Sequence, residues 1–230
     1  MSELWKSSIF FGVFITIAFY GVGIVIKGKL KWTICNPLLL AIALTIGFLA
    51  IFGIDYGTYL SSAKYIGWLL TPATIALALP LYEQIGMMKR NFAAVLAGVT
   101  AGVVTSLTTI FALSALFHLS HASYVTLLPK SITTAIGMGV AEELGGYVAI
   151  TAAVIIVTGI LGNMLAEPLC RLAKIENPIA RGIAIGSASH AIGTVKAMEM
   201  GAVEGAMSSL ALIAAGILTV FAAGLYAPLL

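Results

Sequence analysis

Hydroxyl, ammonium and imidazole groups gather in two stretches of this sequence, both in its second half. The first stretch, Leu128–Gly146, contains a lysine followed by serine and threonine, and the second, Ile183–Gly201, carries a histidine in a similar setting. Such groups supply hydrogen-bond donors and positive charge, which a small carboxylate requires of a binding site. The residues predicted to bind such a solute are Lys130, Ser131, Thr133, Thr134, Ser187, Ser189, His190 and Thr194.

Each of these groups also has a purely structural interpretation. Lys130 could extend its stem to the membrane interface. His190 could form a hydrogen bond between helices or, because imidazole titrates near neutral pH, carry a coupling proton. On a continuous helix, Ser187, His190 and Thr194 would share one face. Further candidates for ion coupling or ion pairing are Lys196, Glu199, Glu204 and Asn36.

The composition places these groups inside a lipid bilayer. Of the 230 residues, 60% are hydrophobic and only 9% are charged, whereas about 25% of a typical soluble domain is charged. This excludes a soluble globular protein, a disordered chain and a nucleic-acid binder. The two cysteines follow no metal or disulfide spacing, and no phosphate-loop or hydrolase motif occurs. We therefore expect no cofactor, no metal and no nucleic-acid partner.

The elements that must position the polar groups are membrane helices. A spanning helix needs about 20 apolar residues, and six segments qualify: Ser7–Ile26, Ile34–Ile54, Tyr65–Tyr82, Phe92–Phe117, Tyr147–Ala166 and Val203–Ala227. The two polar stretches are expected to be broken or re-entrant half-helices. The sequence therefore predicts an all-α polytopic membrane protein, with a single domain over residues 1–230. Most loop lysines and arginines fall on one side, which predicts an external N-terminus.

The two polar stretches also resemble each other. The residues 130–146, KSITTAIGMGVAEELGG, pair with residues 186–202, GSASHAIGTVKAMEMGA, at an offset of 56. Because one full span separates the copies, they would enter the membrane from opposite sides. Units over about 128–166 and 183–227 would then form an inverted repeat, which is typical of secondary transporters. The alternative is a chance likeness between helices rich in small residues.

Four motifs, in this order, resemble the LrgB/CidB family of bacterial inner-membrane proteins: Asn36–Ile42, Thr71–Gln84, Leu128–Val140 and Gly186–Leu212. The resemblance covers essentially the whole chain. It implies a multi-pass protein of the bacterial cytoplasmic membrane and a smaller LrgA/CidA-like membrane partner. Members were named for holin- and antiholin-like effects on murein hydrolase activity and lysis. Related pairs are associated with pyruvate uptake, and the plant plastid glycolate/glycerate transporter resembles a fusion of both components.

Two functional hypotheses follow. The first is a secondary transporter of small organic monocarboxylates, such as pyruvate, lactate or glycolate, that works by alternating access. The second is a holin- or antiholin-like oligomeric membrane protein that regulates murein hydrolase export or lysis with its partner. In either case we expect a homo-oligomer, most simply a dimer. An enzyme is not expected, since intramembrane hydrolysis would need two aspartates or a Ser–His pair and Asp55 is the only aspartate.

Overall fold

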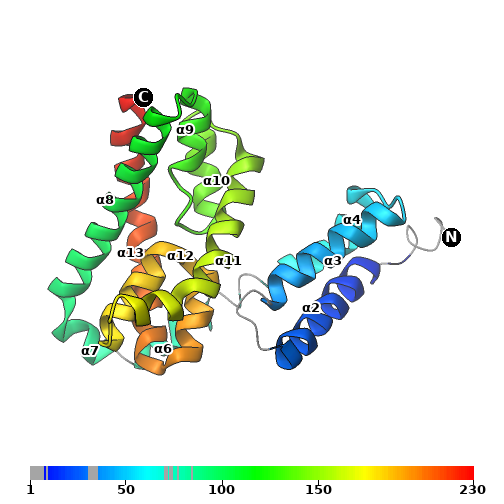
Figure 1. The fold of residues 1–230 in the computed structure, drawn as a ribbon, viewed down its shortest axis with the longest axis horizontal. Coiled ribbons are helices and arrows are strands. Elements are labelled where there is room, and N and C mark those ends of the chain that lie inside the picture. The colour runs from blue at the N-terminus through cyan, green and yellow to red at the C-terminus, as the bar shows by residue number, and fades with distance from the viewer. Residues whose placement is uncertain are drawn as a thin grey trace. The chain divides into compact units, whose positions relative to one another are not determined.

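The helices form two compact units. The computed structural model describes residues 8, 10–30, 36–69, 72, 75, 76, 78–83 and 85–230. Unit 1 covers Met1–Leu77 and unit 2 covers Ala78–Leu230. Within the described residues the regular secondary structure is helical (Figure 1), as predicted. The grouping of residues 1–230 into one membrane domain stays a prediction.

The described residues of unit 1 form three helices, and the second and third of these begin at capped positions. The side-chain oxygen of Asn36 accepts hydrogen bonds from the backbone N–H groups of Leu38 and Leu39, and Pro37 occupies the first helical position, where its missing N–H costs nothing. Asp55 begins the next helix in the same way. The three helices are α2 (Phe11–Leu30), α3 (Pro37–Ile51) and α4 (Tyr56–Gly67).

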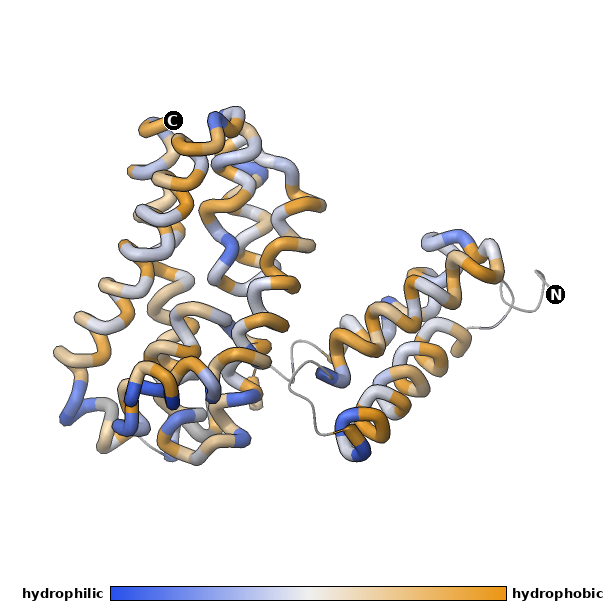
Figure 2. The backbone as a smooth tube through the Cα atoms, viewed as in Figure 1, coloured by the Kyte–Doolittle hydropathy of each residue, from blue (hydrophilic) through white to orange (hydrophobic). Residues whose placement is uncertain are grey.

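Unit 2 is framed by three helices of 25 residues each: α8 (Phe92–Leu116), α11 (Val148–Leu172) and α13 (Ala202–Tyr226). At 1.5 Å per residue, each is about 37 Å long and can cross a hydrocarbon core of about 30 Å. Figure 2 shows apolar residues along these helices and hydrophilic residues gathered toward the ends of the unit. With α2, they are the four long apolar helices among the described residues, so the chain is a polytopic α-helical membrane protein.

Between α11 and α13 the chain folds back on itself at one residue. Helix α12 (Pro178–Met200) is interrupted at His190, which has φ 43° and ψ −143°. A straight helix of this length would hold its ends about 33 Å apart. Instead, Arg181 and Met200 line the same cavity, and the Cγ2 atom of Ile185 lies 3.1 Å from the position of a Cβ on Gly193. Thus α12 is a hairpin of two half-helices with its tip at His190.

A second hairpin lies between α8 and α11. It consists of α9 (His121–Leu127) and α10 (Thr134–Glu143), joined by the non-helical residues 128–133. The start of α11 returns to α9, because the backbone N–H of Tyr147 donates to Oγ1 of Thr126 over 2.8 Å. Both predicted broken segments are therefore hairpins, and their entry and exit on one side of the membrane stays a prediction.

The two hairpins enter unit 2 from opposite ends. Helices α8 and α13 run in one direction and α11 runs in the other, so that α9–α10 follows the upper end of α8 and α12 follows the lower end of α11 (Figure 1). Helices α8 and α11 begin 56 residues apart, at Phe92 and Val148, which is the offset of the sequence repeat. The repeat thus includes α8, where no similarity is recognisable in the sequence. The boundaries 128–166 and 183–227 stay predictions, although the first hairpin begins earlier, at His121.

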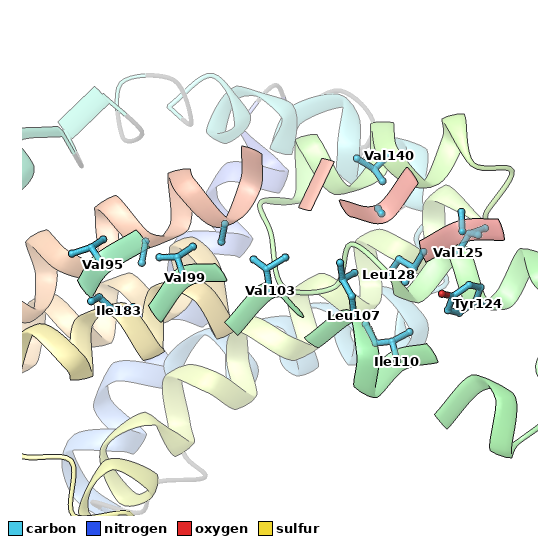
Figure 3. Close-up of a cluster of buried hydrophobic side chains, with 14 of the residues drawn as sticks. Val95, Val99, Val103, Leu107, Ile110, Tyr124, Val125, Leu128, Val140 and Ile183 are labelled. Carbon is cyan, nitrogen blue, oxygen red and sulfur yellow. The ribbon is translucent and has the colours of Figure 1, made fainter. Parts of the chain in front are cut away.

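Helix α8 carries the core that both hairpins share. Val95, Val99, Val103 and Leu107 are buried and recur every four residues, so they form one stripe along the helix (Figure 3). Ile183 of α12 packs at one end of this stripe and α9 packs at the other (Figure 3). A single apolar stripe therefore holds the two hairpins in one compact unit.

The predicted spans need three corrections. The third span was expected to begin at Tyr65, but Tyr65 lies near the end of α4, which starts after the cap at Asp55 and is too polar to count as a span. Residues 70, 71, 73, 74 and 77 of that span, as well as Ser7 and Ile34 at the starts of the first two, lie outside the described residues. The second span is a helix of only 15 residues. The fifth continues through Pro168 to Leu172.

The opposed hairpins predict which segments share a side of the membrane. In protein lacking native thiols (Cys35→Ser, Cys170→Ala), we expect an impermeant maleimide to label Glu176→Cys and Ala202→Cys from one side of oriented vesicles. Phe117→Cys and Glu143→Cys should be labelled from the other side. Labelling of Glu176→Cys and Ala202→Cys from opposite sides would show that α12 crosses the membrane, and the hairpin would be wrong.

Candidate functional site

The tip of the first hairpin places a lysine among hydroxyl groups. The ammonium of Lys130 donates to Oγ of Ser131 over 3.0 Å, and that oxygen lies 3.3 Å from Oγ of Ser106 on α8. Ser131 is buried and Lys130 is half-buried. Helix α10 begins immediately afterwards, with Thr133 at the cap position and Thr134 as the first helical residue. The tip therefore combines a cation, hydroxyls and the free backbone N–H groups of a helix start.

The tip of the second hairpin is a buried histidine. His190 is 3% exposed, and its Nε2 lies 2.9 Å from the backbone oxygen of Ile155 on α11. Because a carbonyl oxygen can only accept a hydrogen bond, Nε2 carries the hydrogen and Nδ1 is the nitrogen left to exchange a proton. The imidazole fits against Gly159, where a Cβ would lie 2.6 Å from the ring. Helix α11 thus approaches the tip closely only because it has glycine there.

The hydroxyls beside His190 are buried against the long helices. Thr194 donates to the backbone oxygen of His190 over 2.9 Å and contacts Oγ of Ser208 on α13 at 2.8 Å. Ser187 donates to the backbone oxygen of Ile183. It also faces α8, where a Cβ on Gly102 would lie 2.9 Å from its oxygen. Ser189 fills the space that Gly162 leaves on α11.

The two tips lie between the same pair of helices. On α8, Gly102 faces Ser187, and Ser106, one turn further on, contacts the first tip. On α11, the carbonyl of Ile155 binds the second tip, while its side chain packs against Gly137 of α10 behind the first. The structure therefore brings the predicted binding residues of both repeats to one region inside unit 2.

This arrangement can bind a small anion without its water shell. A buried carboxylate needs charge compensation and several hydrogen-bond donors. Lys130, the hydroxyls and the N–H groups at the start of α10 can supply both. Among the described residues, no three His, Cys, Asp or Glu side chains lie close enough together to hold a metal ion.

One prediction about the second tip is wrong. Ser187, His190 and Thr194 do not share the face of a continuous helix, because the backbone leaves the helical conformation at His190. Their proximity comes instead from the reversal of the chain. The reversal also places Lys196 and Glu199 at the open end of the hairpin, away from the tip.

Three of the four coupling or ion-pair candidates belong to unit 2 and lie away from its tips. Lys196 and Glu199 are at the open end of the α12 hairpin, where Nζ of Lys196 is 3.5 Å from Oε2 of Glu199. Glu204 is buried near the start of α13, with Oε1 3.9 Å from Nη1 of Arg181. Asn36 belongs to unit 1, where it begins α3.

Sequence reasoning missed the residues that the long helices contribute. These are Ser106 on α8, Ile155, Gly159 and Gly162 on α11, and Ser208 on α13. The only sequence signal for them is small residues within otherwise apolar spans, which permit close approach between membrane helices. The repeat offset of 56 also relates Ser106 to Gly162, and each faces a serine of its neighbouring hairpin.

Comparison with known proteins gives one consistent result. A family model described as the LrgB-like family matches residues 16–229. The antiholin-like protein LrgB of Bacillus subtilis is 35% identical over 212 residues, which is 92% of both chains. The proteins of the same name from Bacillus cereus and Bacillus anthracis are 32% identical over 220 residues, 95% of this chain and 96% of theirs. No solved structure matches the chain.

The backbone at His190 predicts an unusual order of stabilities. Its φ of 43° lies in a region that glycine adopts without strain. We therefore expect His190→Gly to be more stable than His190→Ala by about 1 kcal/mol, although glycine is about 1 kcal/mol worse than alanine inside a regular helix. Thermal unfolding in detergent checks this. As a control, Ala214→Gly inside α13 should lower the stability of the protein. A His190→Ala variant more stable than His190→Gly would contradict the break in the helix.

Proposed function

The chain belongs to the LrgB-like family, and we propose that it carries small organic monocarboxylates across the bacterial cytoplasmic membrane by alternating access. The class includes pyruvate, lactate and glycolate. One observation supports the proposal most directly: the tips of two hairpins that enter unit 2 from opposite ends both lie between α8 and α11, and Lys130 stands among hydroxyls at one of them. A site between opposed half-helices can be reached from either side in turn.

In this proposal Lys130 neutralises the carboxylate. The hydroxyls of Ser131, Thr133, Thr134, Ser187, Ser189 and Thr194 hydrogen-bond the solute or hold the tips in place. His190 donates from Nε2 to Ile155, and its other ring nitrogen is available to bind the solute or a coupling proton. No bond of the solute is made or broken, so the chain acts as a carrier and not as an enzyme.

The orientation and assembly of the carrier complete the proposal. The N-terminus lies outside, because the basic loops then face the cytoplasm. The chain forms a homo-oligomer, most simply a dimer. It acts together with a membrane partner of the LrgA type.

Loss of the Lys130 charge tests the carrier. In proteoliposomes, Lys130→Ala should lower the uptake of labelled pyruvate about tenfold or more, because a hydrogen bond to a charged group contributes about 1.5–3 kcal/mol. Lys174→Ala removes an exposed lysine outside the tips and should leave uptake near the wild-type rate. Uptake by wild type should also saturate, and lactate should compete with pyruvate. Unchanged uptake in Lys130→Ala would refute the carboxylate site.

A second candidate function is favoured by the name that the relatives carry, antiholin-like protein LrgB. In this role the chain regulates murein hydrolase export or lysis with an LrgA-type partner, and the polar tips serve to pack the hairpins. The names of these relatives support this role more directly than they support carboxylate transport.

The two functions differ in what the purified protein does to a sealed vesicle. A holin-like assembly should release trapped solutes without regard to size or charge, and Lys130→Ala should leave that release unchanged. A carrier should retain large neutral solutes and exchange only one class of carboxylate. Efflux of a mixture of labelled pyruvate, sucrose and a fluorescent dextran measures the difference, and selective loss of pyruvate would count against the holin-like role.

A further inference from the structure

A second hollow in unit 2 is lined by charged side chains that the tips do not use. It has a volume of about 380 Å³ and lies at the open end of the α12 hairpin, between that hairpin and the last turns of α11. Its charged lining consists of Arg171, Arg181, Lys196, Glu167 and Glu199. Cys170 forms part of the wall between them.

One carboxylate bridges two of the cations in this cavity. Oε1 of Glu167 lies 2.5 Å from Nη2 of Arg171, and Oε2 of the same group lies 3.0 Å from Nζ of Lys196. Glu199 approaches Lys196 less closely, at 3.5 Å. Arg171 and Lys196 therefore hold the two oxygens of one carboxylate between them.

The remaining cation is anchored elsewhere. Nε of Arg181 donates to the backbone oxygen of Ile175 over 2.7 Å, and its Nη1 faces the buried Glu204 at 3.9 Å. Arg171 and Lys196 are thus the cations whose carboxylate partner can be exchanged. Because the side chain of Glu167 is 37% exposed, water and salt screen the pairs it makes, and such pairs are weak.

We propose that this cavity is a second binding site for a small organic carboxylate, in which the solute replaces Glu167 between Arg171 and Lys196. The exchange substitutes one carboxylate for another, so neither cation is left unpaired. The choice of ligand class rests on the proposed carrier function, whereas the site itself rests on the bridging carboxylate and the cavity beside it.

The cavity shares part of its wall with an apolar groove. Cys170 also lines an apolar groove of about 490 Å³ that follows α11 and α12 as far as Gly162 and Ser189. Ser189 immediately precedes the tip residue His190. The groove can accept only apolar groups, whereas the cavity holds the charged end of a solute and concentrates carboxylates at this end of unit 2.

Cys170 provides a native reporter of occupancy. In the full-length Cys35→Ser protein in detergent it is the single thiol, and mass spectrometry follows its alkylation by N-ethylmaleimide. Sodium pyruvate at about ten times its dissociation constant should slow alkylation about tenfold, because only about one site in eleven is then free. Methyl pyruvate and sodium chloride at equal concentration should not slow it.

Two sets of variants separate the roles of the cation and the competing acid. Lys196→Gln should abolish protection by pyruvate, and Lys196→Arg should retain it, while Lys174→Gln at an exposed position near the same end should behave as wild type. Glu167→Gln removes the internal competitor and should lower the half-protecting pyruvate concentration about threefold. Glu142→Gln, an exposed acid at the far end of unit 2, should not change it.

Several results would overturn the site. The first is that pyruvate leaves the alkylation rate of Cys170 unchanged or raises it. The second is that pyruvate protects Lys196→Gln as well as it protects wild type. The third is that it protects Glu167→Gln less well than wild type. Elution as a single species in size-exclusion chromatography, with Lys196→Arg as the charge-conserving reference, excludes misfolding as the cause. Lys130→Ala should lose uptake but keep protection. Protection without any uptake by wild type would refute the carrier and leave this site standing.

Discussion

A broken helix inside a bilayer must find partners for the backbone groups that it frees, because the lipid offers none. In this molecule the two breaks, at residues 128–133 and at His190, lie inside unit 2, enclosed by its long helices. The same constraint explains why polar side chains surround the breaks. The carbonyl of Ile155 receives the imidazole of His190, and Thr194 satisfies the carbonyl of His190 itself. A region rich in hydrogen-bond donors is thus a consequence of interrupting a helix inside the bilayer.

Close approach makes that enclosure possible. Gly102, Gly159 and Gly162 stand where the long helices touch the α12 hairpin, and a Cβ at any of them would lie within 3 Å of a hairpin side chain. The apolar stripe of α8 packs on both hairpins. The two repeats are therefore interleaved, and a motion that separates them as two rigid halves would expose the shared core. Movement of a hairpin against the frame formed by the long helices is more consistent with this packing.

The hairpins differ in the contacts that hold them to the rest of unit 2. Ion pairs join α12 to α11 and α13 through Glu167, Lys196 and Glu204. Uncharged hydrogen bonds hold the other hairpin, where Tyr124 donates to the backbone of Tyr226 and Thr126 accepts from Tyr147. Salt and charged solutes act on the first set and hardly on the second. The two hairpins thus enter unit 2 from opposite ends, but charged contacts that an anion can displace hold only the α12 hairpin.

The sequence by itself determined that the chain lies in a lipid bilayer, where most of its long helices are, and that it has two polar, opposed half-helical segments. These properties depend on composition, on the length of apolar runs and on a repeat that can be read locally. Only the tertiary structure decided that α8 belongs to the repeat, that the chain reverses at His190, and that Lys196 and Glu199 lie at the open end of a hairpin rather than beside the tip. Each of these depends on contacts between residues far apart in the chain, such as Ile155 with His190 and Glu167 with Lys196, and local patterns carry no record of such pairings.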